Sequence, residues 1–228
     1  MRRDGGIVCA DTRPQAVIFD FEGTLVDFQW DLKAAEREVR KILSDSGFAS
    51  DSLAGENYAQ LWNRAVNLPG GGGSESPLVS RLEEVYDHYD MDALTRWKPR
   101  EEAKDVLGAL RRAGVACAVV SNVGGIALKS ALTRFGLASQ LDSVICRNDV
   151  ERMKPAADGL NQCLQALGTD ADRTLFVGDS LSDVRAARAA GAPVVIVTGG
   201  ESAVSDFDGE PPDRFIDGLA AVKPLVGT

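Results

Sequence analysis

The sequence has little of what several protein classes require. It contains one histidine and four cysteines in 228 residues, and the cysteines show no metal-binding spacing. No apolar run approaches the roughly 18 residues of a membrane span. Positive charge is also in deficit, because the net charge is −9, which argues against nucleic acid or an anionic membrane as the main partner. We therefore expect a cytoplasmic protein whose cysteines are reduced core residues.

What the sequence does have is enough apolar material for a sizeable core. Hydrophobic residues make up 44% of the chain, which suits one main core and a small second unit. Residues 1–15 read as a short, loose leader. In so acidic a chain, an anionic small substrate would need local positive charge, and a bound cation can supply it.

The chain is organised around one stretch, Ala16–Asp27, with the sequence AVIFDFEGTLVD. Its short β-branched and aromatic run predicts a buried parallel strand. Gly23 breaks the run, so Asp20 lies at the carboxyl end of this strand, where open α/β sheets bind their ligands. Taken alone, Asp20 would more often be a turn or cap aspartate.

Three later apolar runs end in polar groups in the same way. They are Val115–Val120 before Ser121-Asn122, Ser143–Cys146 before Arg152-Met153-Lys154-Pro155, and Thr174–Gly178 before Asp179-Ser180-Leu181-Ser182-Asp183. Helical patterns separate them, which predicts a parallel sheet with right-handed crossovers.

The region from about Gln29 to Arg96 interrupts the alternation. It predicts three helices, the first capped by Asp31 and the others over Leu53–Val66 and Pro77–Tyr89. Between the last two, Pro69–Ser76 reads as a flexible glycine-rich loop.

Acid, hydroxyl, lysine and paired acids, in that order, resemble the four motifs of the haloacid dehalogenase (HAD) superfamily of phosphohydrolases. The resemblance covers the whole core of the chain. It implies an α/β fold: a Rossmann-like, three-layer parallel-sheet core from residues 1–28 and 97–228, with a small helical cap, 29–96, inserted after the first motif. It also implies a magnesium-dependent phosphomonoester hydrolase, similar to the phosphoglycolate phosphatase branch, acting on a small phosphorylated metabolite.

The resemblance also assigns roles to individual residues. Asp20 is the expected nucleophile, and it would form an aspartyl-phosphate. The phosphate-binding residues are Ser121, Asn122 and Lys154, of which Ser121 and Lys154 are also catalytic. The expected Mg²⁺ ligands are Asp20, the backbone carbonyl of Glu22, Asp179 and Asp183, the last more often acting indirectly.

Elementary electrostatics supports a cation among these acids. Two carboxylates about 4 Å apart repel by about 4 kcal/mol at an effective dielectric near 20. A hard cation with oxygen ligands, hence magnesium, relieves that repulsion. Two further features suit an anion: backbone donors at Gly124-Gly125, where a strand turns toward a helix, and Lys154, placed by Pro155 near a helix start.

Glu22 departs from the family pattern, in which the position holds the second acid of Asp-x-Asp. A general acid must approach its partner closely, and glutamate is one methylene longer. Glu22 therefore either works with adjusted geometry or leaves a slow enzyme. Two alternatives stay open: a HAD-fold binding or regulatory protein with little turnover, and a phosphosugar mutase.

The predicted cap gives weaker signals. We interpret its aromatic residues and Trp97 as packing residues rather than a substrate cage, and His88 as part of a solvated face. Arg64 is a less favoured candidate for a distal substrate charge. The aromatic residues in question are Trp30, Trp62, Tyr86 and Trp97. The expected partner is the small substrate itself, and the chain is expected to be a monomer or homodimer.

Overall fold

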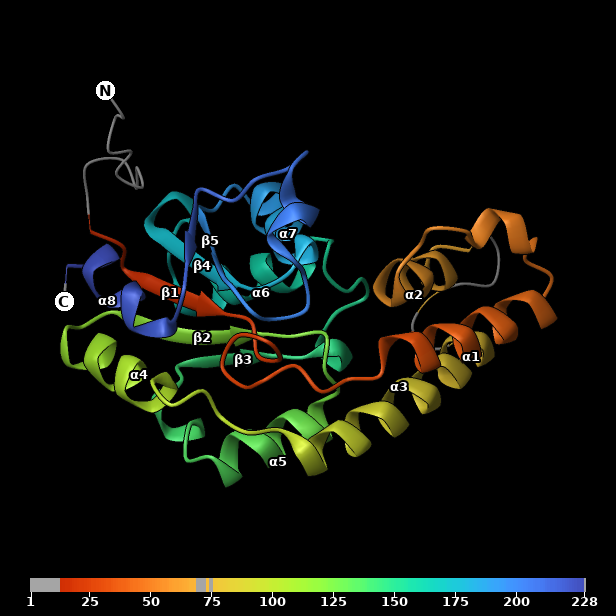
Figure 1. The fold of residues 1–228 in the computed structure, drawn as a ribbon, viewed down its shortest axis with the longest axis horizontal. Helices are drawn as coiled ribbons and strands as arrows, with labels where there is room; N and C mark the ends of the chain where they lie inside the picture. Colours follow the sequence, from red (N-terminus) through yellow and green to blue (C-terminus); the bar gives the residue numbers. More distant parts are fainter. Residues whose placement is uncertain (1–12, 69–72, 74–75, 228) are drawn as a thin grey trace.

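The computed structural model describes residues 13–68, 73 and 76–227. Cys9, most of the predicted leader and most of the predicted glycine-rich loop, including Gly70–Gly72, lie outside these residues. The described part contains a six-stranded parallel sheet in the order β3-β2-β1-β4-β5-β6 (Figure 1). Its strands are β1 (Ala16–Phe19), β2 (Ala116–Val120), β3 (Ser143–Ile145), β4 (Thr174–Gly178), β5 (Val194–Val197) and β6 (Arg214–Ile216).

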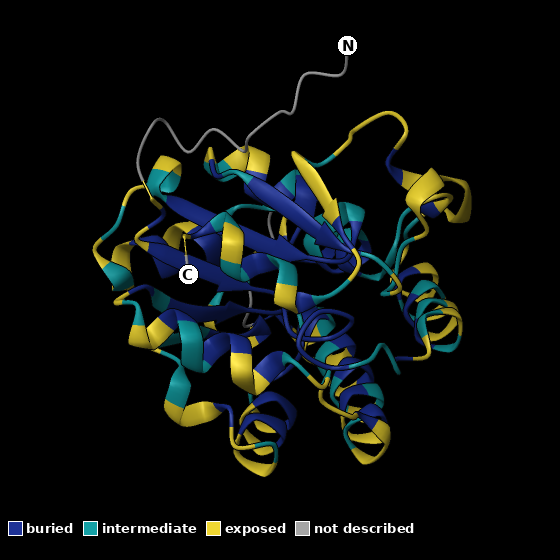
Figure 2. Ribbon diagram, turned by 60° about the vertical axis from the view of Figure 1, so that its left-hand side comes forward, coloured by how far each residue is buried: buried dark blue, intermediate teal, exposed yellow. Residues whose placement is uncertain are grey.

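The sheet is covered on both faces, which explains why its strands are continuous apolar runs rather than alternating ones. All residues of β1, β4 and β5 are buried, and in β2 only Ala116 is partly exposed (Figure 2). Val17 and Phe19 belong to one core cluster, whereas Ile18 belongs to the other. The period-2 geometry of a strand thus divides one apolar run between two cores.

Helices form the outer layers and complete the predicted three-layer α/β fold. The cluster with Val17 also contains residues of α4 (Ala103–Arg112), α5 (Gly125–Arg134) and α8 (Val222–Leu225). The opposite cluster contains residues of α6 (Asp158–Leu167) and α7 (Leu181–Ala190). Most element ends lie within one or two residues of the predicted ones, which is ordinary fraying.

Three further helices lie beyond the carboxyl ends of the strands (Figure 1). We call them the helical insertion: α1 (Leu32–Asp45), α2 (Tyr58–Val66) and α3 (Pro77–Arg96). They pack on one another. Asp31 caps α1 by accepting a 3.0 Å hydrogen bond from the Ala34 amide, as predicted. We keep residues 29–96 as the proposed bounds of a cap, as predicted from the sequence. No helix in the described ranges is long and apolar enough to cross a membrane.

Two helices of the insertion differ from prediction. The predicted helix from Leu53 starts only at Tyr58, because Gly55 has a φ of 78° and Asn57 forms a capping box with Gln60. Helix α3 continues seven residues past Tyr89, to Arg96. The extra turns carry Asp90, which is 2% exposed, into the interior.

Candidate active site

The candidate site lies at the carboxyl ends of three neighbouring strands. Strand β1 pairs with β2 on one side and with β4 on the other. The strands that follow β1 in the sequence therefore lie on both sides of it in the sheet. Such a switch point is where open α/β sheets bind ligands. Asp20, Ser121 and Asp179 each follow directly after one of these strands, and the fold therefore brings them to one place.

Three carboxylates gather there. Asp20, Asp179 and Asp183 are buried, and each offers an oxygen within 4.8 Å of the other two. Asp179 accepts hydrogen bonds from Thr24 Oγ1 at 3.0 Å and from the Glu201 amide at 2.6 Å. Burial, together with the charges of Asp183 and Asp20, raises the pKa of Asp179 well above its usual range. Oxygen-only donors and excess negative charge suit a hard divalent cation such as Mg²⁺.

Two glycines hold Asp179 in place from either side. A Cβ atom added at Gly23 or at Gly200 would lie 2.1 Å from Asp179 Oδ2. Gly23 also has a φ of 81°, which other residues rarely adopt. The loops after β1 and β5 can therefore close on the carboxylate only because both positions lack a side chain.

Lys154 bridges two of the acids. Its Nζ lies 2.6 Å from Asp20 Oδ1 and 2.7 Å from Asp183 Oδ1. Burial alone would favour the neutral amine, but the two carboxylates outweigh it and raise the pKa of Lys154. Burial raises the pKa of Asp20 to about 6, although Lys154 acts in the opposite direction. Lys154 sits in a loop rather than at the predicted helix start, since α6 begins only at Asp158.

Asp183 is fully engaged by hydrogen-bond donors. Its Oδ2 accepts from the amides of Asp179 and Ser180 and from Ser180 Oγ, at 2.8–3.1 Å. Its Oδ1 accepts from Lys154. This arrangement orients the lysine and the loop after β4, and it favours an indirect role for Asp183 at a metal.

The residues after β2 have more protein partners than the sequence suggests. Ser121 Oγ accepts from the Val123 amide at 3.2 Å and keeps its own proton to donate. The Asn122 side chain bonds to both backbone groups of Lys154 at 3.0 and 3.1 Å, so it positions that loop. The Gly124 amide donates to Asp90 Oδ2 at 2.8 Å, and the Gly125 amide to Asn148 Oδ1. The donors expected for an anion at Gly124-Gly125 are therefore already occupied.

Glu22 is held by three donors on one oxygen. Its Oε1 accepts from the amides of Gln29 and Trp30, each at 2.8 Å, and from Trp97 Nε1 at 2.7 Å. Oε2 is thereby left as the oxygen that can carry a proton. Burial raises the pKa of Glu22 to about 7, although the hydrogen bond from Trp97 lowers it. A carboxyl that titrates near neutral pH is suited to acid/base work.

Residues of the helical insertion lie beside these groups and help to enclose a pocket. The pocket has about 480 Å³ of empty space, including the part open to solvent. Its floor contains Asp20, Glu22, Ser121 and Lys154, as predicted for a common site. The other lining residues are Phe28, Trp30, Leu32, Tyr58, Tyr86, Asp90, Asn122, Val123, Arg147, Ser180, Ser182 and Glu201.

The remaining predicted cap residues divide into two groups. Trp30 and Tyr86 pack as expected but also line the pocket, which the packing interpretation did not include. Trp62 packs on Tyr86 and does not line the pocket. His88 is exposed. Arg64 pairs with Glu56 away from the pocket, which disfavours a role for it in binding a distal substrate charge.

Sequence reasoning missed three charged groups that line the pocket, Glu201, Arg147 and Asp90. Glu201 follows Gly199-Gly200 shortly after β5. An apolar strand followed by polar residues could therefore have indicated it, as it indicated the other site residues. Arg147, just after β3, is 2% exposed. Its Nη1 lies 2.7 Å from Asp90 Oδ2, and its Nη2 pairs with Asp87. Through Asp90, helix α3 is thus joined to Arg147 and to the Gly124 amide.

The fold and this acid–lysine cluster define a HAD-type hydrolase. A family model described as haloacid dehalogenase-like hydrolase matches residues 17–197, and the chain belongs to this family. A phosphoglycolate phosphatase of Rhodospirillum rubrum is 32% identical over 83% of this chain and 81% of its own length. An N-acetylmuramic acid 6-phosphate phosphatase of Pseudomonas aeruginosa is 30% identical over 81% of this chain and 82% of its own length.

Solved structures agree on the fold. A haloacid dehalogenase-like hydrolase of Bacteroides fragilis superposes with a TM-score of 0.68 and 22% identity, over 92% of this chain and all of that one. Together with the family match, these relatives make the chain a phosphatase of the HAD superfamily.

Proposed function

We propose that the protein is a magnesium-dependent phosphomonoester hydrolase that works through an aspartyl-phosphate on Asp20. The observation that supports this most directly is the Lys154 ammonium, 2.6 Å from Asp20 Oδ1, together with an Asp179 oxygen within 4.8 Å of one on Asp20. A nucleophile, a cation and further ligands for a second cation thus meet at the carboxyl ends of the central strands. Asp20, Asp179 and the Glu22 carbonyl would hold Mg²⁺, which supplies charge neutralisation for the phosphoryl oxygens.

The first half-reaction follows from the groups around the pocket floor. An Asp20 oxygen forms a bond to phosphorus as the bond to the leaving oxygen breaks. Glu22 Oε2 gives its proton to that oxygen, which leaves as an alcohol. Lys154 and the Ser121 hydroxyl donate to the phosphoryl oxygens, where negative charge is concentrated.

The second half-reaction reverses the role of Glu22. Its carboxylate now takes a proton from water as the water oxygen attacks phosphorus. The bond from phosphorus to Asp20 breaks, inorganic phosphate leaves, and both carboxyls return to their starting states. The three donors on Oε1 keep the glutamate oriented through both steps, which addresses its extra length.

The alternatives receive less support. A regulatory protein without turnover would not need Lys154 buried against Asp20 and Asp183. A phosphosugar mutase would return the phosphoryl group to a sugar hydroxyl, so release of inorganic phosphate separates it from a hydrolase. The names of the relatives suggest phosphoglycolate or N-acetylmuramic acid 6-phosphate as candidate substrates. We further propose a cytoplasmic monomer or homodimer without nucleic-acid or membrane partners.

Hydrolysis of p-nitrophenyl phosphate with and without Mg²⁺ tests the proposal. Excess chelator should abolish phosphate release, and Mg²⁺ should restore it and raise the thermal midpoint by binding only the folded chain. Asp179→Asn should remove both effects. Asp172→Asn, an exposed acid before the opposite end of β4, is the matched control and should behave as wild type. Full activity in chelator would refute the metal assignment.

A further inference from the structure

The cations of the pocket are already matched by protein carboxylates. Among the described residues that line the pocket, Arg147 and Lys154 are the positively charged ones. Lys154 contacts Asp20 and Asp183, and it is also the group that would face the phosphoryl oxygens. Arg147 contacts Asp90 and Asp87 and is 2% exposed. A second negative charge on the substrate would therefore find no free cation among the described residues that line the pocket.

The pocket also carries a carboxyl that the proposed phosphoryl transfer does not use. Glu201 lines it, and its carboxylate makes no ion pair within the described part of the chain. In either protonation state this carboxyl can accept a hydrogen bond from a hydroxyl group. It cannot offer positive charge to an acid. Beside this carboxyl, the pocket favours hydroxyls over carboxylates.

Aromatic rings form one wall of the pocket. The ring centroid of Trp30 lies 4.8 Å from that of Tyr58 and 5.8 Å from that of Tyr86. All three residues line the pocket. Such a wall offers flat apolar area against which the C–H face of a saturated ring can pack.

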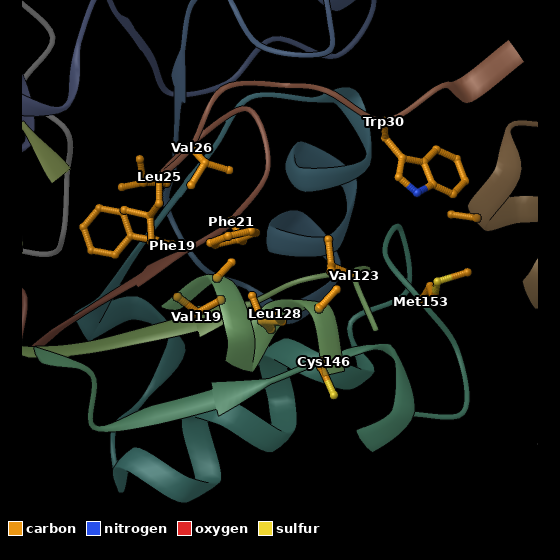
Figure 3. Close-up of a cluster of buried hydrophobic side chains, with 14 of the residues drawn as sticks. Phe19, Phe21, Leu25, Val26, Trp30, Val119, Val123, Leu128, Cys146 and Met153 are labelled. Atoms are coloured by element: carbon orange, nitrogen blue, oxygen red, sulfur yellow. The ribbon is translucent and has the colours of Figure 1, made fainter. Parts of the chain in front are cut away.

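Trp30 adds an unused donor to this wall. It is 7% exposed, and its indole Nε1 has no hydrogen-bond partner among the described residues. Figure 3 shows this nitrogen on the edge of the ring turned toward Val123 and Met153, and Val123 also lines the pocket. A buried donor without an acceptor is unfavourable, so a ligand oxygen that accepts from it would gain affinity.

We propose that the preferred substrates are phosphate monoesters with an uncharged, ring-shaped, hydroxylated leaving group, such as a hexose, rather than one that carries a carboxylate. The ring packs on Trp30, Tyr58 and Tyr86. One ligand oxygen accepts from Trp30 Nε1, and one ligand hydroxyl donates to Glu201. This inference rests on the proposed phosphatase function, and it departs from the acids after which the relatives are named.

A matched substrate panel on the wild-type enzyme tests it. Glycerol 3-phosphate and 3-phosphoglycerate differ by a hydroxymethyl group against a carboxylate. Glucose 6-phosphate and glucitol 6-phosphate differ by a ring against an open chain. We expect kcat/KM to favour the first member of each pair, and glucose 6-phosphate to exceed phosphoglycolate by at least about tenfold. Smaller or reversed preferences overturn the inference.

Variants locate the effect in the pocket. Trp30→Phe keeps the ring but removes the N–H, and it should lower kcat/KM for glucose 6-phosphate relative to p-nitrophenyl phosphate by about 3–10-fold. Trp62→Phe, an indole outside the pocket, should leave that ratio unchanged. Glu201→Lys should raise the 3-phosphoglycerate to glycerol 3-phosphate ratio, whereas Glu201→Gln should not. Unchanged ratios in Trp30→Phe and Glu201→Lys would overturn the assignment of this subsite.

The proposed function and the substrate class fail differently. Release of phosphate from p-nitrophenyl phosphate with a preference for phosphoglycolate overturns only the substrate class. Absence of phosphate release from every ester, with Mg²⁺ present and the chain folded, overturns both.

Discussion

Shortening Glu22 by one methylene is the sharpest test of how the site works. Glu22→Asp withdraws the carboxyl by about 1.5 Å, one C–C bond. It then cannot keep all three contacts that Oε1 now makes, at 2.7–2.8 Å, with the amides of Gln29 and Trp30 and with Trp97 Nε1. The variant therefore perturbs both the fold around the site and the position of the acid.

The expected magnitudes follow from these contacts. Each buried donor left without its acceptor costs about 1–3 kcal/mol. Two such donors imply a thermal midpoint at least about 4 °C lower, at roughly 2–4 °C per kcal/mol for a chain of this size. A displacement of about 1 Å from the productive geometry slows a reaction by on the order of a hundredfold. Glu22→Asp should therefore be both less stable and slower.

Glu22→Gln separates the role of the Glu22 proton from that of the three hydrogen bonds that Oε1 accepts. The amide oxygen can accept from the same three donors, so the thermal midpoint should stay within about 2 °C of wild type. Loss of the proton should slow hydrolysis of poor leaving groups such as sugar phosphates by about 10²–10⁴-fold. Nitrophenyl phosphate, whose leaving group hardly needs a proton, should be affected least.

The assay is steady-state release of inorganic phosphate, together with differential scanning fluorimetry. Glu101→Gln, at an exposed site, is the control. Wild-type rates for Glu22→Gln on sugar phosphates would remove Glu22 from the proton transfers. A faster Glu22→Asp would show that the three donors are not adapted to the longer side chain.

The remaining predictions concern the nucleophile, pH and the helical insertion. Asp20→Asn should abolish turnover in a folded protein and lose binding of fluoroberyllate, an aspartyl-phosphate mimic; near-wild-type turnover would make water the nucleophile instead. In chelator, folded Glu22 and Glu201 have pKa values of about 7 and 8 because of burial, above the roughly 4.3 of exposed glutamate. The folded chain then binds more protons than the unfolded one between about pH 4 and 8, so its thermal midpoint should fall as pH rises through this window; a flat or rising profile would contradict this. Fluoroberyllate with Mg²⁺ should slow amide exchange in α1–α3 but not in α4, and equal protection throughout would argue against closure of the insertion over the site.

Prediction from sequence succeeded where chain direction and burial act together. Asp20, Ser121 and Asp179 end apolar strands, and parallel strands bring their carboxyl ends to one edge, so the floor of the site followed from local patterns. Glu201 carried the same signal, since it closely follows β5, but its strand lies one position further from β1.

The walls of the pocket were harder to predict. Tyr86 lies on α3 at helical spacing, and a buried aromatic residue gives the same pattern whether it packs on a neighbour or also faces a ligand. The partner of the Gly124 amide depends on Asp90, 34 residues earlier. Asp90 lies one residue beyond the predicted end of that helix, and helix ends are the least determined part of a local pattern.

The link between Asp90, Arg147 and Gly124 restricts how this enzyme can be rebuilt. A chimera that receives the helical insertion of a relative would exchange residue 90 but retain residue 147. If the incoming helix lacks an acid there, Arg147 keeps a buried charge without its main partner, which destabilises a fold by about 3–5 kcal/mol. Insertions should therefore be grafted together with residue 147, so that positions 90 and 147 are transplanted as one unit.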